Sequence, residues 1–494
     1  MNFVTASSLS TRKSADLLVI PFWKGKKGAE AASAMENPLS KLLEGPLSLR
    51  DFLGKEGEML IVYASGQSEK RLALLGLGEC EKITVERLRR AYAQVAKTCQ
   101  KQKFKEINIL PPSCEGMSTE DLVRGICEGL LLPNYAFTML KHDSLKENKP
   151  EILAKATLIG INKQDLAKAQ RYATLSESVN FVRDLVNGNA DDITPQCLAS
   201  AARDLEKTCK HVKTTLFDKK RIEKEKMGLL LAVNRGSFRD PVFAIIEYKG
   251  NPKSSDHTVV VGKGITFDTG GLNLKPTGSM ETMKGDMAGA AAVLGIIQAA
   301  SALGLKVNVT GVFASTENCI DALSFKPGDV YAGYSGKTVE ISNTDAEGRL
   351  ILADALAYTV EKLKPSRIID LATLTGAVEI ALGDEITGLM TNNDVLADLL
   401  VRAGSETGEK VWRLPLPEEY REALKSDIAD IKSTGGRAGG CLKAGLFLQD
   451  FVGKTPWAHL DIAGTAFVSE AKRYQPKYAT GIGVRLIISF LELL

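Results

Sequence analysis

The stretch HTVVVGKGITFDTGG, residues 257–271, decides the fold class of this chain. Its run of valines and other β-branched residues is typical of a strand buried on both faces, and the glycine pair after Asp268 predicts a tight turn. Such strands occur in sheets that helices cover on both sides. Because open α/β sheets bind ligands at the carboxyl ends of their strands, we expect Lys263 and Asp268 to lie at a functional site.

A second polar segment, NTDAEGRL at 343–350, places Asp345, Glu347 and Arg349 at alternate positions before an apolar helix predicted over 351–363. Residues two apart on a helix point about 200° away from each other. We therefore expect an extended segment that holds the three side chains on one side. Neighbouring carboxylates raise each other's pKa, and a bound metal ion is the usual means of keeping both ionised. The alternative is an acidic first turn that stabilises the helix dipole, with Arg349 in solvent.

A third segment, METMKGDMAGAAAVLGIIQAA at 280–300, predicts a long alanine-rich helix with Asp286 in its first turn. The positive end of the helix dipole would keep this carboxylate ionised. Lys275 lies between this segment and the first strand. The sequence therefore predicts a cluster of carboxylates and lysines where strands end and helices begin.

The whole chain predicts an α/β fold with two domains. Its 494 residues are too many for one hydrophobic core. We expect a smaller N-terminal α/β domain over 1–162, a linker helix over 163–187, and a larger C-terminal catalytic domain over 188–494 with a central mixed sheet flanked by helices. The predicted strands are LLVIPF, MLIVYAS, RLALLGLG and KEINILPP in the first domain, and FAIIEYKG, TVVVGKGI, KVNVTGVFA, RIIDLAT and AHLDIAG in the second.

Composition excludes several classes of protein. The chain is 44% hydrophobic and 25% charged, with a net charge of +3, which is ordinary for a globular protein and argues against a nucleic-acid partner. Eight scattered cysteines without a CxxC pair predict reduced thiols in a cytoplasm. The start of the chain does not resemble a signal peptide, and the uncharged stretch 287–305 reads as a buried helix, so no membrane association is expected.

The four histidines do not predict a catalytic site. They lie apart, without the i, i+4 spacing of a helical zinc pair and without a serine or cysteine in a nucleophile elbow. Structural or surface roles are expected for them. This leaves the carboxylate cluster as the predicted reaction centre.

The chain resembles the cytosolic leucine aminopeptidases of the two-metal leucyl aminopeptidase family. The resemblance covers essentially all of residues 180–494, in the family's order and spacing, while the first 160 residues match only in character. The segments that carry it are VGKGITFDTGG, LKP at 274–276, MKGDMAGAAAV at 283–293, NTDAEGRL, DLATLTGA at 370–377, SDIADIKSTGGRAGG and PWAHLDIAGTAF. Serine is usual in the family where Thr269 stands, which leaves a hydroxyl in place.

The resemblance implies a role for each residue of the site. Two divalent metal ions per subunit would be held by Lys263, Asp268, Asp286, Asp345 and Glu347. The catalytic residues would be Lys275 and Arg349, with a bicarbonate anion bound at the arginine. The pocket for the first side chain of the substrate would include Met283, Thr373 and Gly376, while Asn343 and Leu374 would touch the substrate backbone.

The chemistry of these residue types is consistent with that assignment. Four carboxylates balance two divalent cations, so a metal-bridging hydroxide would leave the core slightly negative. Lys275 and Arg349 make it positive again, which leaves room for one more anion. Lys263 must lose its proton to bind a metal, which burial beside a metal can force on a lysine. Oxygen ligands with one amine tolerate several metals, and we expect zinc or manganese, with magnesium or cobalt as alternatives.

The predicted function is removal of the N-terminal residue, preferably leucine-like, from peptides with a free N-terminus by a hydroxide that bridges the two metals. The resemblance also implies a homohexamer built as a dimer of trimers. Two alternatives remain at this point. One is a two-metal phosphoesterase, and the other is a non-enzymatic protein whose N-terminal domain binds a nucleotide derivative.

Overall fold

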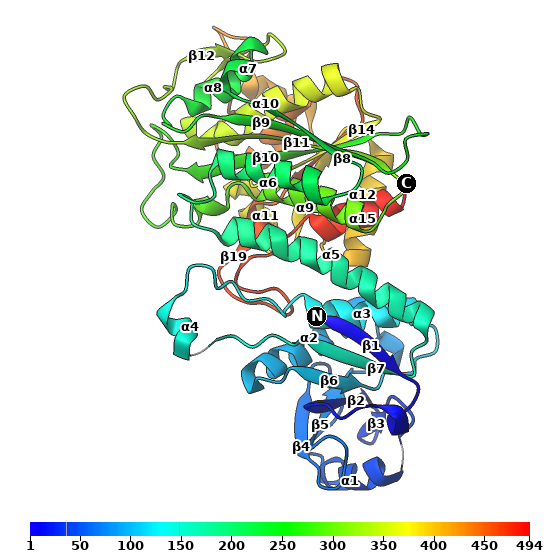
Figure 1. The fold of residues 1–494 in the computed structure, drawn as a ribbon. Helices are drawn as coiled ribbons and strands as arrows, with labels where there is room; N and C mark the ends of the chain where they lie inside the picture. The colour runs from blue at the N-terminus through cyan, green and yellow to red at the C-terminus, as the bar shows by residue number, and fades with distance from the viewer. Residues whose placement is uncertain (36, 148) are drawn as a thin grey trace. The chain divides into compact units, whose positions relative to one another are not determined.

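The computed structural model describes residues 1–35, 37–147 and 149–494, and the chain divides into two compact units (Figure 1). The first unit contains Met1–Glu177 together with Glu470–Pro476, and the second contains Ser178–Ser469 and Lys477–Leu494. The division falls within helix α5 (Lys163–Asn187), which has the bounds that the sequence predicts.

The first unit contains a mostly parallel sheet with the strand order β1-β7-β6-β2-β5-β4, and β3 pairs with β2. Strand β4 is antiparallel to β5, and the other neighbours along this order are parallel. The strands are β1 (Asn2–Ala6), β2 (Leu17–Lys24), β3 (Ala29–Ala31), β4 (Met59–Tyr63), β5 (Arg71–Gly76), β6 (Glu106–Ile109) and β7 (Lys155–Ile159). The helices are α1 (Asn37–Ser48), α2 (Val85–Gln102), α3 (Thr119–Leu131) and α4 (Asp143–Glu147), with 3-10 turns η1 (Leu9–Thr11) and η2 (Cys80–Lys82).

Both faces of this sheet are covered by apolar side chains. Along β2, Leu17 and Val19 point into a core that contains residues of α2 and α3, whereas Leu18 and Ile20 point into a second core that contains residues of α1. This alternation is the period of a β-strand. The four strands that the sequence predicts in this part of the chain are β2, β4, β5 and β6.

The second unit contains an eight-stranded mixed sheet with the order β16-β15-β18-β14-β10-β11-β9-β8. Its centre is parallel, because β18, β14, β10 and β11 run in one direction, and the antiparallel pairs are β15 with β18, β11 with β9 and β9 with β8. The strands are β8 (Val212–Phe217), β9 (Val242–Lys249), β10 (Thr258–Asp268), β11 (Asn308–Asn318), β14 (Arg367–Ala372), β15 (Thr387–Thr391), β16 (Val411–Arg413) and β18 (Trp457–Asp461). The predicted mixed sheet is confirmed.

Helices cover both faces of the sheet, as the buried strands require. Helices α6 (Pro195–Thr208) and α9 (Ala288–Ala302) pack against one face, and α8 (Gly228–Asn234) and α10 (Glu347–Tyr358) pack against the other (Figure 1). The remaining helices are α7 (Lys219–Lys224), α11 (Gly376–Leu382), α12 (Asp394–Thr407), α13 (Gly440–Gln449), α14 (Ala463–Ala466) and α15 (Val484–Glu492), with short turns η3 (Met283–Gly285), η4 (Thr344–Ala346), η5 (Thr359–Leu363) and η6 (Glu418–Leu424). Small strands complete the unit: β12 (Val330–Ala332), β13 (Thr338–Glu340), β17 (Ile431–Lys432), β19 (Phe467–Val468) and β20 (Tyr478–Ala479).

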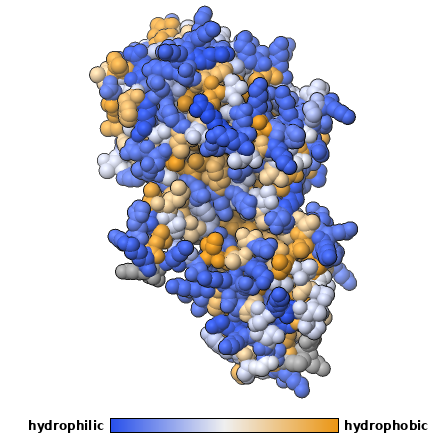
Figure 2. All heavy atoms as spheres, viewed as in Figure 1, coloured by the Kyte–Doolittle hydropathy of each residue, from blue (hydrophilic) through white to orange (hydrophobic). Residues whose placement is uncertain are grey.

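Helix α9, the uncharged stretch of the sequence, is buried between the sheet and neighbouring helices. In the part of the chain that the structure describes, no helix has the length and apolar character that crossing a membrane demands. The face of the molecule drawn in Figure 2 is mostly hydrophilic, with its hydrophobic residues in small separate patches.

Candidate metal centre

The predicted lysines and carboxylates meet at the carboxyl end of β10. Lys263 lies within this strand and its side chain is buried, with 4% of its surface exposed. Its Nζ lies 2.7 Å from Asp286 Oδ1 and 2.8 Å from Glu347 Oε1. Gly348 makes this approach feasible, because a Cβ at that position would lie 2.5 Å from Cε of Lys263.

Lys275 forms a second bridge on the same cluster. Its Nζ lies 2.8 Å from Asp268 Oδ2 and 2.5 Å from Asp345 Oδ1. Asp268 is the last residue of β10 and Asp345 lies in η4, so this lysine joins the two acidic segments of the sequence. The structure thus brings together six of the seven residues that were predicted as ligands or catalytic groups, and the seventh, Arg349, forms no ion pair with them among the described residues.

The backbone of the second acidic segment corrects one prediction. We expected an extended segment over 343–350, but only Asn343 is extended. Residues 344–346 form a 3-10 turn, and Glu347 is the first residue of α10. Asp345 and Glu347 therefore meet different lysines, and Arg349 donates from Nη1 to the carbonyl oxygen of Ser433 at 2.8 Å. The prediction was wrong because it assumed that the three side chains share one side of the chain, whereas each meets a different partner.

Asp286 also differs slightly from its predicted position. It caps η3 and precedes α9 by two residues, so it lies before the helix and not in its first turn. Its carboxylate is buried among residues from other elements. Thr373, which follows β14, donates from Oγ1 to Asp286 Oδ1 at 2.7 Å, and Lys263 donates to the carbonyl oxygen of Thr373 at 2.8 Å.

Burial and mutual charge shift the pKa values of this cluster in opposite directions. Burial raises the pKa of Asp268 to about 6, and the nearby Glu347 adds to that shift. Burial also raises the pKa of Asp286 well above its usual range. The pKa of Glu347 is lowered, because Lys263 and Lys275 outweigh the effect of its burial. The pKa of Lys263 is raised, since the carboxylates of Asp286 and Glu347 outweigh its burial.

These residues fit divalent metal ions. Single oxygen atoms of Asp268, Asp286 and Glu347 lie within 4.8 Å of one another, and all three residues are buried. Asp286 Oδ2 is buried and accepts no hydrogen bond from the described residues. Each of the two ammonium groups contacts two carboxylates, so four ionised carboxylates and two ammonium groups would carry two more negative than positive charges. A buried group of this charge and geometry is suited to hard cations with oxygen ligands.

Arg349 is buried beside the cluster with 7% of its surface exposed. Burial lowers the pKa of its guanidinium to about 10, partly offset by Glu347 and Asp461. Among the described residues, nothing accepts a hydrogen bond from its buried Nε. A guanidinium has five N–H donors, so this side chain has donors left for an anion.

The predicted substrate-binding residues lie on three segments near the cluster. Asn343 accepts from the backbone N–H of Asp345 at 2.8 Å and so shapes the η4 turn. Thr373 touches Asp286 directly. Leu374 packs partly buried against the main apolar core, and its N–H donates to Asp461 Oδ1 at 3.1 Å. Met283 is half-buried in η3, and Gly376 is exposed at the start of α11.

Three residues of the site were not predicted. Asn318 ends β11 and donates from Nδ2 to Asp268 Oδ1 at 2.8 Å. Thr344 donates to the carbonyl oxygen of Gly270, and Asp461 accepts from Thr375 Oγ1 at 2.7 Å. The strand predicted over 458–464 carried a signal for Asp461, because the reasoning applied to Asp268 holds for every parallel strand of the sheet. Asn318 lies beyond the strand predicted over 306–314.

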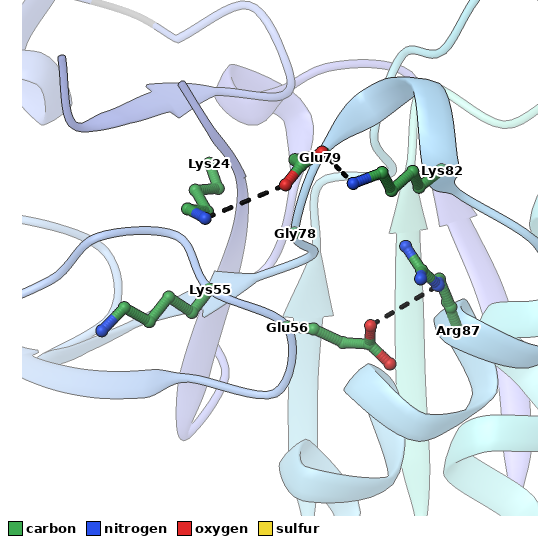
Figure 3. A pocket seen from close by; sticks show the side chains of 7 residues that line it. All are labelled: Lys24, Lys55, Glu56, Gly78, Glu79, Lys82 and Arg87. Atoms are coloured by element: carbon green, nitrogen blue, oxygen red, sulfur yellow. Dashed lines mark ion pairs between the residues drawn. The ribbon is translucent and has the colours of Figure 1, made fainter. Parts of the chain in front are cut away.

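The first unit holds a separate cavity of about 220 Å³, drawn in Figure 3. Its lining is Lys24, Lys55, Glu56, Gly78, Glu79, Lys82 and Arg87. Glu79 pairs with Lys82 at 2.6 Å and with Lys24 at 3.8 Å, and Glu56 pairs with Arg87 at 3.5 Å. The paired side chains are between 34% and 60% exposed, so this is a solvated ion-pair network to which we assign no ligand.

Comparison with known proteins identifies the family of this chain. Residues 180–488 match the model of the cytosol aminopeptidase family, catalytic domain, and residues 19–144 match that of the family's N-terminal domain. A probable cytosol aminopeptidase of Protochlamydia amoebophila is 56% identical over 100% of this chain and 99% of its own length. A probable cytosol aminopeptidase of Chlamydia abortus is 46% identical over 99% of this chain and 98% of its own length.

Solved structures give the same result. A mutant of tomato leucine aminopeptidase superposes with a TM-score of 0.88 at 32% identity, covering 100% of this chain and 97% of its own. The bottromycin maturation enzyme BotP, solved in complex with Mn, superposes with a TM-score of 0.85 at 30% identity, covering 97% of this chain and 99% of its own. These matches favour neither the phosphoesterase nor the non-enzymatic alternative. This chain belongs to the cytosol aminopeptidase family and is a metal-dependent aminopeptidase.

Proposed function

We propose that this aminopeptidase removes leucine-like N-terminal residues from peptides with two divalent metal ions held by Lys263, Asp268, Asp286, Asp345 and Glu347. The observation that carries the proposal is the buried group of Asp268, Asp286 and Glu347, with an oxygen of Asp286 that lacks a hydrogen bond from the described residues. The bound metals would supply a Lewis acid for the scissile carbonyl and a water molecule activated for attack.

The residues around the metals would bind and orient the substrate. Asp286 would accept a hydrogen bond from the free α-amine of a peptide, which is supported by its buried Oδ2, an oxygen without a donor among the described residues. The Lys275 ammonium would stabilise the negative charge that develops on the carbonyl oxygen. It is suited to this because its pKa is raised by Asp268, which outweighs its burial and keeps it charged at neutral pH. Recognition of the amine restricts cleavage to the first peptide bond.

Arg349 would hold a bicarbonate anion through the donors that Ser433 does not use. An anion fits this position because four carboxylates balance two divalent cations, and Lys275 and Arg349 then add two positive charges. Bound there, the anion would supply a general base, and Arg349 would hold and orient it.

The pocket for the first side chain would include Met283, Thr373 and Gly376, with Asn343 and Leu374 against the substrate backbone. Met283 is half-buried and adaptable, and a Cβ built on Gly376 would meet nothing within 4 Å beyond its chain neighbours and its own helix backbone, which supports room for an aliphatic side chain there. We expect leucine to be preferred without strict exclusion of other residues. Values of kcat/KM for leucine, valine, glycine and glutamate p-nitroanilides test this order.

The remaining features of the proposal rest on the family. We propose residues 188–494 as the catalytic domain, 1–162 as the N-terminal domain and 163–187 as the helix between them. We also propose zinc or manganese as the metals, a cytoplasmic location in keeping with the names of the relatives, and a hexamer built as a dimer of trimers. Mass photometry measures the oligomeric state, and anomalous scattering at metal edges identifies the metals.

The central experiment compares hydrolysis of leucine p-nitroanilide and p-nitrophenyl phosphate with and without added manganese. We expect metal-dependent release of p-nitroaniline and no release of p-nitrophenol. Metal content is measured in parallel for the wild type and for Asp268→Ala, Asp286→Ala and Glu347→Ala. Full metal content in Glu347→Ala would refute its assignment as a ligand.

A further inference from the structure

Strand β10 has a register shift just before its last residue, and this shift decides what Asp268 faces. Ile265 pairs with Thr316 of β11, and Asp268 pairs with Asn318. Three steps along β10 thus correspond to two steps along β11, which describes a β-bulge. In an unbroken register, Asp268 would pair with Cys319. The bulge therefore places the carboxylate opposite an asparagine.

Asn318 uses this position to join the two acidic segments. Its side chain is fully buried, and Nδ2 donates to Asp268 Oδ1 at 2.8 Å and to the carbonyl oxygen of Thr344 at 3.0 Å. Both acceptors are oxygens, which fixes the orientation of the amide. The main-chain carbonyl oxygen of Asn318 accepts from the N–H of Thr269 at 2.9 Å. One residue thus holds a predicted ligand, the turn after β10 and the η4 turn.

Thr344 forms the other half of this connection. It is fully buried and lies directly before Asp345. Its Oγ1 donates to the carbonyl oxygen of Gly270 at 2.6 Å and accepts from the N–H of Asn273 at 2.8 Å. The N–H of Thr344 donates to Asn273 Oδ1 at 2.8 Å.

The fit around this threonine is close. Gly271 has a φ of +64°, and a Cβ there would lie 2.9 Å from Thr344 Oγ1. The turn after β10 and the η4 turn are thus tied by hydrogen bonds that use neither lysine of the cluster.

We propose that Asn318 and Thr344 are positioning residues that hold Asp268 and the Asp345–Glu347 segment at the spacing that metal binding requires. The inference rests on the ligand assignment of the proposed function. It follows from the charges: four carboxylates in one buried volume repel one another, and the two lysines that offset this repulsion contact the same carboxylates that the metals would use. A rigid spacing before metal entry must come from other residues, and these two connect the segments directly.

The test measures metal binding, not only activity. Metal-stripped wild type, Asn318→Ala, Thr344→Val and Thr344→Ser are titrated with Mn²⁺, and free Mn²⁺ is followed by electron paramagnetic resonance. Loss of groups that orient metal ligands typically costs about 10–100-fold in affinity. We expect that loss for Asn318→Ala and Thr344→Val at one or both sites. Thr344→Ser keeps the hydroxyl and should bind Mn²⁺ as the wild type does.

Asn308→Ala is a matched control, because Asn308 begins the same strand and donates from Nδ2 to the carbonyl oxygens of Asn251 and Ser254 at 2.8 and 3.0 Å. It should lower thermal stability without changing Mn²⁺ affinity. Equal Mn²⁺ affinity in wild type, Asn318→Ala and Thr344→Val would overturn the proposal, as would an equal loss in Asn308→Ala.

Asp268→Ala separates this proposal from the ligand assignment. Unchanged Mn²⁺ binding in Asp268→Ala would refute the assignment itself. Reduced binding in Asp268→Ala with normal binding in Asn318→Ala and Thr344→Val would refute only the positioning role. If Asn318→Ala does not fold, the comparison of Thr344→Val with Thr344→Ser decides the matter, because valine has nearly the same shape as threonine.

Discussion

Replacement of Arg349 by alanine separates catalysis from metal binding and from stability. The guanidinium donates to the carbonyl oxygen of Ser433, and among the described residues no carboxylate of the cluster forms an ion pair with it. Arg349→Ala should therefore retain its metals. Loss of a positioned general base costs about 10²–10⁴ in rate, which is about 2.7–5.4 kcal/mol at 1.36 kcal/mol for each factor of ten.

The stability cost of this change is smaller and can be distinguished from the catalytic one. Removal of the donor leaves the buried carbonyl of Ser433 without this hydrogen bond, which costs about 1–3 kcal/mol. We expect the melting temperature to fall by a few degrees and the protein to remain folded at 25 °C.

The assay is hydrolysis of leucine p-nitroanilide over a range of substrate and bicarbonate concentrations, with metal content measured on the same samples. Arg349→Ala should keep KM within a few-fold, lose kcat by the stated factor, and lose any dependence on added bicarbonate. Arg349→Lys keeps the charge without the planar fork and should recover only part of the rate. Turnover equal to the wild type, or metal loss equal to that of Glu347→Ala, would refute the role of Arg349 as an anion-binding residue.

Three further predictions concern the protonation of Lys263, the protonation of His459 and the oxidation of Cys80 with Cys114. The carboxylates of Asp286 and Glu347 outweigh burial and raise the pKa of Lys263, so this lysine must release a proton when it binds a metal. Calorimetry in buffers of different ionisation enthalpy should therefore show that the wild type releases at least one more proton on metal binding than Lys263→Met does. Equal proton release would contradict ligation by this lysine. His459 is buried with Nδ1 2.5 Å from Asp370 Oδ1, and this carboxylate outweighs burial and raises the pKa of the histidine. The ion pair between the protonated histidine and Asp370 therefore stabilises the fold fully below about pH 6.5, and this stabilisation is lost as the pH rises through the folded-state pKa. Urea denaturation should show stability falling by up to about 1.4 kcal/mol per pH unit in that range, and His459→Gln should remove this slope; an unchanged slope would assign it to another group. Cys80 and Cys114 have Sγ atoms 3.5 Å apart, so glutathione disulfide should oxidise both thiols to one intramolecular disulfide, with two protons transferred and two glutathione molecules released. Burial raises the pKa of Cys80 to about 11, so this reaction should be faster at pH 9 than at pH 7. Peptide mass spectrometry that found only mixed disulfides would contradict this pairing.

The sequence was sufficient for the strands at the centre of the sheets. Strands such as β10 and β14 are buried on both faces, so they appear as nearly continuous apolar runs. Strand β8 was not predicted because it lies at the edge of its sheet, where only Val212 and Phe217 are buried and the residues between them are exposed or half-buried. Strand β15 contains Gly388, and a short strand with glycine has a weak signal.

The candidate site was predictable wherever a single segment carried the signal. Lys263 and Asp268 could be located from one strand and its turn. The direction of Asp345, Glu347 and Arg349 could not, because it depends on where the helix begins, and α10 starts four residues earlier than the 351–363 segment implied. Asn318 was not predicted because its contact with Asp268 arises from a bulge, which depends on the pairing of two strands and leaves no mark in either one alone.

The segment Glu470–Pro476 belongs to the first unit although it lies near the end of the chain. Its Tyr474 is 4% exposed and donates from its hydroxyl to Glu86 Oε2 at 3.0 Å. A fragment that stops after α5 would lack this segment and would expose the surface that Tyr474 covers. Truncation at one point therefore cannot yield an intact first unit. Independent expression of the first unit would need a fusion that restores residues 470–476. A protease that cuts within this segment would break the chain of the first unit and also separate Lys477–Leu494 from the rest of the second unit.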